Sequence, residues 1–477
     1  MYQVGCFTDT REIQLHASMG EYIDRIDAFI WGPATIVLLV GTGLYLTIRL
    51  RFIQLFRFWL SLKILSGKTR EESLIGELSH FGALAVALSA TIGNGNIAGV
   101  ATAIALGGPG AVLWMWVTAV VGMATVFTST TLALAYRQHD KITGYSGGPM
   151  HYIEKGLGEK WKPMARFFAF CLIIAAFGTG NMVESNSVAD TLEFTLRDVI
   201  GYAANPTDIF SVKLAIGAVY GVLVWLVIVG GITRIGRVVT SLVPLMFMVY
   251  LISSLVVLCL NADAVPGVLA SIFNDAFTGT AAAGGFAGAG VMAVMQFGVA
   301  RGVFSNEAGL GTTPIALATA RSDEPVRAGL VAMNGPFFDT LVICTLTALV
   351  ILTTGVWKTG VSGSELTTMA FNSTIPHLGK LAVTLSLLFF SFSSVIGWSY
   401  YGDRGITYLW GGRATRNYKI IFCLLLPLGA VLKLELVWAV CDIANALMAI
   451  PNLVALLLLS PVVFRLTQDY FRRYPKE

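Results

Sequence analysis

Gly93-Asn94-Gly95-Asn96-Ile97-Ala98-Gly99 lies in the middle of a long apolar run, Phe81 to Leu106, and not at its edge. Each glycine inside a helix costs about 1 kcal/mol relative to alanine, and asparagine side chains compete for the backbone hydrogen bonds. The stretch therefore predicts a break in a helix at membrane depth. We interpret the break as a ligand or ion site, because freed backbone groups in a bilayer must line a cavity or bind something. The alternative, close helix packing by small residues, explains the glycines but not the two asparagines.

The composition is typical of a multi-pass membrane protein. Of the 477 residues, 55% are hydrophobic and 13% are charged, with a mean hydropathy of +0.73. Apolar runs of about 20 residues are long enough to cross a bilayer as helices. We predict an all-α protein with eleven spans, near 29–48, 82–106, 110–136, 166–190, 212–231, 238–261, 284–305, 328–352, 380–402, 419–433 and 437–464. Acidic residues precede the first run where a signal peptide would be basic, so we expect this run to stay as a helix.

Lys and Arg residues fall mainly on one side of this predicted arrangement. The loops on the side of the 49–80 connection and of the C-terminal tail hold 24 of them, the opposite side holds 7, and Arg301 lies inside a span. Cytoplasmic loops of membrane proteins are enriched in Lys and Arg. We therefore predict a protein of the cytoplasmic (inner) membrane with its N-terminus outside and its C-terminus inside. The net charge of +4 then reflects topology and indicates no nucleic-acid partner.

A second glycine-rich stretch, Gly284-Gly285-Phe286-Ala287-Gly288-Ala289-Gly290, lies five predicted spans after the first. Paired interruptions in corresponding positions of two halves indicate inverted repeats, with the substrate site between them. Because five is odd, the two halves have opposite topology, as the loop charges require. We expect four regions: an N-terminal segment, extra helix and basic connector (1–80), a first five-helix repeat (81–261), a second repeat (262–464) and a basic cytoplasmic tail (465–477).

Eight motifs, in order along the chain, resemble those of the alanine/glycine:cation symporters, also called the sodium:alanine symporter family. They are Leu44-Tyr45-Leu46-Thr47-Ile48-Arg49, Gly95-Asn96-Ile97-Ala98-Gly99-Val100-Ala101, Gly107-Gly108-Pro109-Gly110-Ala111, Trp114-Met115-Trp116, Gly122-Met123-Ala124-Thr125, Gly180-Asn181-Met182-Val183, Arg301-Gly302-Val303-Phe304-Ser305-Asn306-Glu307-Ala308-Gly309 and Gly397-Trp398-Ser399-Tyr400-Tyr401-Gly402. The resemblance runs from about Ile26 to Tyr408. It implies a leucine-transporter-like 5+5 inverted repeat with two broken helices. It also implies import of a small neutral amino acid, alanine or glycine, with Na⁺ as coupling ion and no organic cofactor.

The first broken helix is the expected substrate cradle. Backbone N–H groups and the positive dipole end of its second half can bind a carboxylate. Carbonyl oxygens freed at the break suit the substrate ammonium or a sodium ion. The expected substrate ligands here are Gly93, Asn94, Gly95 and Asn96, and the expected sodium ligands are Ala90, Thr91 and Gly93. By resemblance, Ser393 and Ser394 complete the sodium site, with Ser394 alternatively a substrate ligand.

The resemblance also places Glu184, Gln296 and Trp398 in the substrate pocket, where Trp398 would limit side-chain size. For Trp398 the alternative is an ordinary core or interfacial aromatic, and for Gln296 an interhelical hydrogen bond. Two positions depart from the family pattern, since Glu184 stands where glutamine is common and Asn94 where threonine is usual. An ionised acid in mid-span costs about 2.5 kcal/mol or more. Glu184 is therefore expected to bind the substrate ammonium, a cation or a coupling proton, unless it acts as a neutral substitute for glutamine.

Arg301 and Glu307 are the other charges that we expect within the membrane. We interpret them as a structural pair, or alternatively as part of an inner gate. Proton coupling through Glu184 is the alternative to sodium coupling.

Two other classes of function are less well supported by the sequence. Gly144-Tyr145-Ser146-Gly147 is similar to the serine motif of hydrolases, but no histidine lies in a predicted span to act as its base. A channel usually forms its pore between symmetry-related subunits, whereas an internal repeat favours alternating access. We therefore expect a transporter and no enzyme.

Overall fold

The computed structural model describes residues 26, 30–68, 75–200, 205–278, 290–432 and 435–475. These residues form helices joined by short connections. The α-helices are α2 (Pro33–Arg49), α3 (Ile53–Phe56), α4 (Phe58–Leu65), α5 (His80–Thr91), α6 (Ala98–Gly107), α7 (Ala111–Ala135), α8 (Pro149–Leu157), α9 (Lys162–Phe177), α10 (Glu184–Ile200), α11 (Pro206–Ile228), α12 (Gly231–Leu260), α13 (Val265–Thr278), α14 (Val291–Asn306), α15 (Thr313–Leu317), α16 (Pro325–Ala332), α17 (Asn334–Pro336), α18 (Thr345–Thr354), α19 (Gly363–Thr374), α20 (Leu378–Trp410), α21 (Thr415–Val431) and α22 (Glu435–Arg473). Strands β1 (Gln138–Asp140) and β2 (Gly144–Ser146) form an antiparallel hairpin.

The predicted break in the helix at 93–99 is confirmed. Helices α5 and α6 are bent by 63° at the stretch that the sequence singles out. Gly93 is extended, and a single 3₁₀ turn, η1 (Asn94–Asn96), leads into α6. The Asn96 side chain accepts a hydrogen bond from the Gly93 N–H at 2.9 Å, so it replaces a bond that a continuous helix would make.

Two further helices contain π-helical turns that the sequence analysis did not predict. The predicted span 166–190 is α9 and α10 joined by the π segment η3 (Gly178–Val183). The predicted span 328–352 contains the π segment η6 (Phe337–Cys344) between α17 and α18. π turns occur mostly as short insertions at functional sites, because they widen the helix and turn side chains to new directions.

Each of the eleven predicted apolar runs overlaps a helix, but not every helix is long enough to count as a span by itself. Among the described residues, seven helices are long and apolar enough to cross a membrane, or eight if the bent α5–α6 pair is one span. The runs that fall short correspond to α2, α14 and α21, of 17, 16 and 17 residues. Eleven crossings therefore remain a prediction. Most of the second glycine-rich stretch, 284–289, lies outside the described residues, and Gly290 caps α14.

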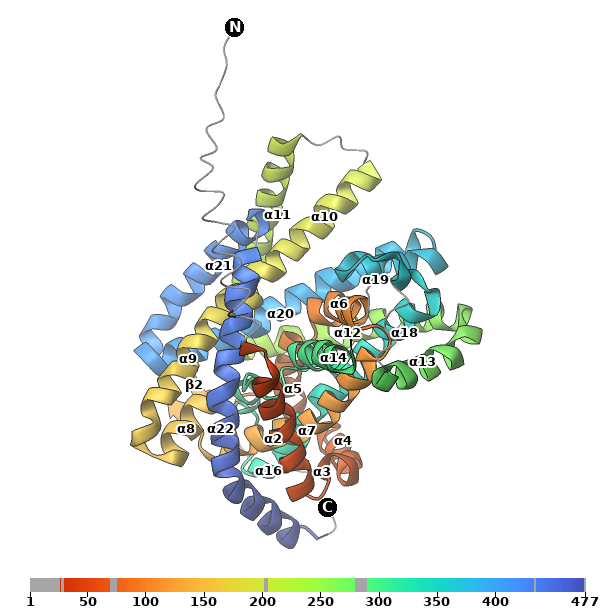
Figure 1. The fold of residues 1–477 in the computed structure, drawn as a ribbon. Helices are drawn as coiled ribbons and strands as arrows, with labels where there is room; N and C mark the ends of the chain where they lie inside the picture. The colour runs from red at the N-terminus through yellow and green to blue at the C-terminus, as the bar shows by residue number, and fades with distance from the viewer. Residues whose placement is uncertain are drawn as a thin grey trace.

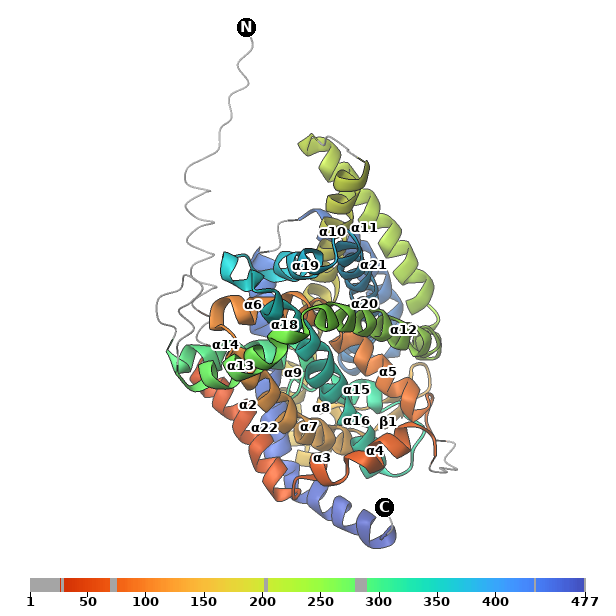
Figure 2. The same cartoon turned by 90° about the vertical axis from the view of Figure 1, so that its right-hand side faces the viewer.

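The helices pack around one large apolar core and a smaller one. α22 runs beside α2 and α9, and the end of α22 lies at the same end of the molecule as α3 (Figures 1 and 2). The hairpin of α10 and α11 projects at the opposite end in Figure 1. Residues of α10, α11, α20 and α21 form the smaller core, which includes Val188, Tyr220 and Phe422. The break in α5–α6 is thus enclosed by α10, α14, α20 and α22.

Candidate functional site

A small cavity of about 30 Å³ lies against the break between α5 and α6. Six predicted substrate residues and two further predicted sodium ligands line it: Gly93, Asn94, Gly95, Glu184, Ser394, Trp398, Ala90 and Thr91. Seven residues that the sequence analysis did not place in the site complete the lining: Thr179, Val183, Phe304, Glu307, Leu310, Trp438 and Asn445. A cavity of this size has room for a very small solute only.

Glu184 is the first residue of α10 and is 5% exposed. The backbone N–H of Asn94 and the hydroxyls of Ser391 and Ser394 face its carboxyl group. Its Oε2 atom is buried and has no hydrogen-bond partner among the described residues. Buried polar atoms are almost always paired, so this oxygen is suited to accept a proton, a cation or an ammonium group.

Two more acceptors of the lining residues are unpaired in the same way. The Asn94 amide donates to Ser187 Oγ at 2.9 Å, and the Asn445 amide donates to Thr179 Oγ1 at 3.3 Å. The Oδ1 atoms of Asn94 and Asn445 are buried without a partner in the described part of the chain. Oxygen acceptors in this number suit a small hard cation or an ammonium group.

Not all of the predicted sodium ligands line the small cavity. Ser394 Oγ–H donates to the Ala90 carbonyl at 3.3 Å, which joins α20 to the end of α5 beside the cavity. Ser393 lies elsewhere, since its hydroxyl donates to the Phe390 carbonyl at 2.9 Å and contacts Met246 Sδ at 3.3 Å. The structure therefore brings Ser394, and not Ser393, to the cavity.

Asn96 and Gln296, both predicted substrate residues, lie outside this cavity. Asn96 is fully buried, and its amide donates to Asp339 Oδ1 at 2.7 Å and to Ser305 Oγ at 3.1 Å. It therefore ties the break to η6 and α14. Gln296 lines a separate cavity of about 110 Å³ with Trp31 and Arg301.

Arg301 and Glu307 form no ion pair with each other within the described ranges. Six residues on a helix place two side chains about 120° apart around its axis, so they point in different directions. Glu307 ends α14 with a φ of 54°, lines the small cavity and accepts a hydrogen bond from Thr312 Oγ1 at 2.5 Å. The Arg301 guanidinium lies 5.9 Å from the ring centre of Phe304. A structural pair between the two charges is thus wrong for this conformation.

A wider cavity of about 320 Å³ adjoins the small one. Both cavities share Asn94, Gly95, Phe304 and Trp438, and the wider one adds Ala98, Gly99, Thr102, Arg301 and Asp442. The rings of Phe304 and Trp438 lie 6.2 Å apart between centroids. Thr102 is hydrogen-bonded to the exposed Ser362 at 3.4 Å, which places the wider cavity near the surface. A route from that surface to the break therefore passes the two aromatic rings.

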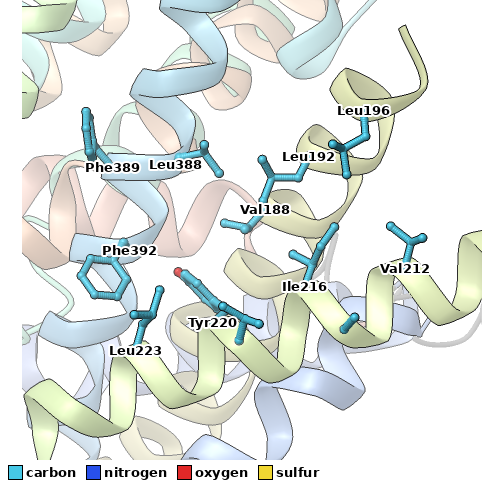
Figure 3. Close-up of a pocket in the computed structure, with 12 residues that line it drawn as sticks. Val188, Leu192, Leu196, Val212, Ile216, Tyr220, Leu223, Leu388, Phe389 and Phe392 are labelled. Atoms are coloured by element: carbon cyan, nitrogen blue, oxygen red, sulfur yellow. The ribbon is translucent and has the colours of Figure 1, made fainter. Parts of the chain in front are cut away.

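Another cavity, of about 580 Å³, is an apolar groove away from the broken helix. It lies between α10, α11 and α20, and Figure 3 shows the Tyr220 hydroxyl as the oxygen among its labelled side chains. Its other lining residues are apolar: Val188, Leu192, Leu196, Val212, Ala215, Ile216, Val219, Leu223, Leu388, Phe389 and Phe392. Such walls offer almost nothing to a charged solute.

Ser146 has a histidine beside it, although this histidine, His151, lies outside the predicted spans. Ser146 Oγ and His151 Nε2 lie 2.9 Å apart, because β2 leads directly into α8. Burial lowers the pKa of His151 from 6.5 to about 4, with Glu154 opposing this shift. Neither Ser146 nor His151 lines any of the cavities described above. The pair therefore joins β2 to α8.

We expect the thermal unfolding midpoint to fall as the pH is lowered from about 7 to about 4.5. The unfolded chain takes up a proton at His151 below about pH 6.5, while the folded chain resists it until about pH 4. The stabilisation is present above pH 6.5, is lost as the pH falls towards 4, and amounts to at most about 3 kcal/mol. Unfolding of the purified protein, followed at several pH values, measures it. The decline should be smaller in His151→Gln and unchanged in His139→Gln, which alters an exposed histidine of the same region; equal declines would refute this account.

Comparisons with known proteins agree with the resemblance of the motifs. The family model described as "Sodium:alanine symporter family" matches residues 16–477. The sodium/alanine symporter AgcS of Methanococcus maripaludis is 44% identical over 454 residues, which cover 94% of this chain and 96% of that protein.

Two relatives from Bacillus subtilis carry names with other substrates or ions. The probable sodium/glutamine symporter GlnT is 39% identical over 455 residues, covering 93% of this chain and 89% of GlnT. The putative sodium/proton-dependent alanine carrier protein YrbD is 36% identical over 475 residues, covering 95% of this chain and 93% of YrbD.

Proposed function

The chain belongs to the sodium:alanine symporter family, and from this membership we propose that it imports a small neutral amino acid, alanine or glycine, together with sodium. It is a multi-pass membrane protein of a family of transporters. No chemical reaction is part of the proposed activity. The proposal requires two small-molecule partners, the amino acid and the ion. The protein acts within a lipid bilayer.

One observation carries the proposal: three acceptors that have no hydrogen-bond partner among the described residues belong to residues that line one small cavity at a broken helix. They are Glu184 Oε2, Asn94 Oδ1 and Asn445 Oδ1. A zwitterionic amino acid presents an ammonium group for acceptors of this kind. Its carboxylate would meet backbone N–H groups and the N-terminal end of the second half-helix. Trp398 lines the same cavity and leaves little room for a longer side chain. Glutamine, which the name of GlnT carries, is therefore the less suitable substrate here.

For the sodium ion we propose the Ala90 and Thr91 carbonyls and the Ser394 hydroxyl, beside Gly93. The contact of Ser394 with the Ala90 carbonyl supports this set. Oxygen ligands without a net charge suit sodium. Ser393 would join only after a rotation of its side chain, because its hydroxyl is bonded within α20.

The transport cycle that we propose is alternating access between two five-helix repeats, 81–261 and 262–464, with 1–80 and 465–477 outside them. The wider cavity supports an extracytoplasmic entrance, because it lies towards the end of α6 and away from the basic loops. In this scheme Phe304 and Trp438 separate the entrance from the substrate, Arg301 lines the entrance, and Glu307 belongs to the cytoplasmic side of the site.

Uptake by the purified protein in liposomes tests the proposal. We expect saturable uptake of radiolabelled alanine or glycine that requires an inward sodium gradient and exchanges with unlabelled substrate. Glutamine serves as the substrate control. Uptake that does not saturate would indicate a channel, and glutamine transported in preference to alanine and glycine would refute the proposed specificity.

Proton coupling through Glu184 is the second candidate. The unpaired Oε2 atom favours it, since a proton satisfies a buried carboxylate as well as a cation does. The relative YrbD is named sodium/proton-dependent. The same liposomes distinguish the two ions when a pH gradient replaces the sodium gradient.

A further inference from the structure

A second polar cavity, of about 510 Å³, lies where α2 ends and the last turns of α22 pass it. Its lining residues belong to the end of α2, to α3 and to the last turns of α22, and these elements lie at one end of the molecule (Figures 1 and 2). The 49–80 connection, which provides most of them, is predicted to be cytoplasmic. Three arginines line it and no acidic residue does: Arg49, Arg51 and Arg57. The remaining walls are Leu50, Ile53, Phe56, Phe464, Thr467, Gln468 and Phe471.

Two of the arginines are held by aromatic rings of α22. The guanidinium carbon of Arg49 lies 5.1 Å from the ring centre of Phe464, and that of Arg57 lies 4.3 Å from the ring centre of Phe471. The cation–π contact of Arg49 fixes the plane of its guanidinium group and leaves the N–H edge of that group for another ligand. Within the described ranges no carboxylate forms an ion pair with Arg49 or Arg51.

The backbone at this place adopts a rare conformation. Arg51 and Phe52 both have a φ of 54°, in the left-handed region that residues with a Cβ atom seldom enter. Hydrogen bonds from the Arg51 N–H to the Ile48 carbonyl (3.0 Å) and from the Phe52 N–H to the Thr47 carbonyl (2.8 Å) hold the turn. The turn ends α2 abruptly and keeps Arg51 beside Arg49 at the cavity. Strained backbone of this kind is often retained where a ligand is held.

The surroundings identify the ligand as a lipid. Phe56 and the neighbouring Trp59 are 77% and 80% exposed, as expected for aromatic residues at the membrane interface. Guanidinium groups bind phosphate in a two-pronged manner, and basic pockets between membrane helices on the cytoplasmic side bind lipid head groups. A free phosphate would leave the apolar wall unused, and a zwitterionic head group would bring a cation of its own towards the arginines.

We propose that this cavity binds an anionic phospholipid, with the phosphate on Arg49 and Arg51 and an acyl chain along the wall of Ile53, Phe56 and Phe464. The lipid would bridge the end of α2 to α22, two helices that already pack against each other. It would therefore stabilise the contact between the extra N-terminal helix and the C-terminal helix.

Phospholipid binding to the delipidated, detergent-purified full chain tests the proposal by native mass spectrometry. Phosphatidylglycerol should bind as one tightly held molecule per chain, and phosphatidylcholine about tenfold more weakly. The double variant Arg49→Gln/Arg51→Gln should bind phosphatidylglycerol about tenfold more weakly than the wild type. The matched control is Arg413→Gln, which removes an exposed charge from the loop between α20 and α21 on the same side and should bind as the wild type.

Three results would overturn the proposal. They are equal binding of phosphatidylglycerol by the double variant and the wild type, equal binding of the two lipids by the wild type, and displacement of the bound lipid by millimolar inorganic phosphate, which would indicate a site for free anions. If the double variant does not fold, Arg51→Gln alone is measured, because the Arg51 side chain is exposed. No amino acid is present in the experiment, so its outcome is independent of the proposed transport function.

Discussion

Gly93→Ala is expected to reduce amino-acid uptake strongly while leaving the fold intact. A Cβ atom at position 93 would lie 3.0 Å from Glu184 Oε1 and 3.3 Å from Ser394 Oγ. It would occupy a cavity of only about 30 Å³, between two side chains that we propose as ligands. Overpacking of a closed site costs about 1–3 kcal/mol, which corresponds to roughly 5- to 150-fold weaker binding. Substrate affinity measured by uptake in liposomes gives the size of the effect.

The same broken helix provides the control for this variant. A Cβ atom on Gly99, in α6, meets no atom within 4 Å. Gly99→Ala should therefore transport almost as the wild type, and its helix should be slightly more stable. If both variants transport equally well, the cavity beside Gly93 is not the substrate site.

Glu184→Gln is expected to reduce uptake about 10- to 150-fold, because hydrogen bonds to a charged group contribute about 1.5–3 kcal/mol. Glutamine keeps the shape and one acceptor of the side chain, so the fold should be unaffected. The loss therefore reports the charge, or the proton, that the carboxylate holds. Uptake at a series of sodium concentrations and pH values measures it, with sodium dependence and pH dependence recorded separately.

Glu193→Gln is the control, because it removes a carboxylate from the same helix without touching the cavity. Glu193 is ion-paired with Arg197, four residues further along α10, at 2.5 Å. This variant should transport as the wild type. Unchanged uptake by Glu184→Gln at every pH, with unchanged specificity, would show that the acid is a neutral substitute for glutamine.

The main features of the fold could be predicted because they depend on local composition. The run of glycine and asparagine at 93–96 breaks its helix, since neither residue type supports a continuous helix and the Asn96 side chain bonds to the backbone instead. The apolar runs locate the helices for the same reason, with ends that differ from the observed ones by up to about ten residues. The π segments were not predicted, because the glycines, Thr179 and Asn181 of Gly178–Val183 and the Asp339 and Thr340 of Phe337–Cys344 do not distinguish a π turn from an α-helical one. Their extra residue is accommodated by tertiary packing.

Site residues could be predicted where the family resemblance covers them. Residues that other helices bring to the cavity were not predicted. Glu184, Ser394 and Trp398 line the cavity as the resemblance implied. Thr179 and Asn445 were missed, although a polar residue inside an apolar run was a signal that could have found them. The aromatic residues Phe304 and Trp438 gave no such signal.

Two predictions failed because residues of one sequence motif do not all point to the same place in the fold. Asn96 lies in the decisive motif, but it points away from the cavity and towards Asp339. Arg301 and Glu307 lie in one motif, but the turn of the helix separates them.

The π segment at 178–183 has a consequence for how α10 faces the site. One residue more than an α-helical turn rotates every following side chain by about 100° around the helix axis. Glu184, the first residue after the segment, lines the cavity beside the broken helix. A segment shorter by one residue would turn the Glu184 side chain by about 100° around the axis of α10 and away from the cavity. The length of the segment, and not only its residues, thus determines which side chain of α10 faces the solute.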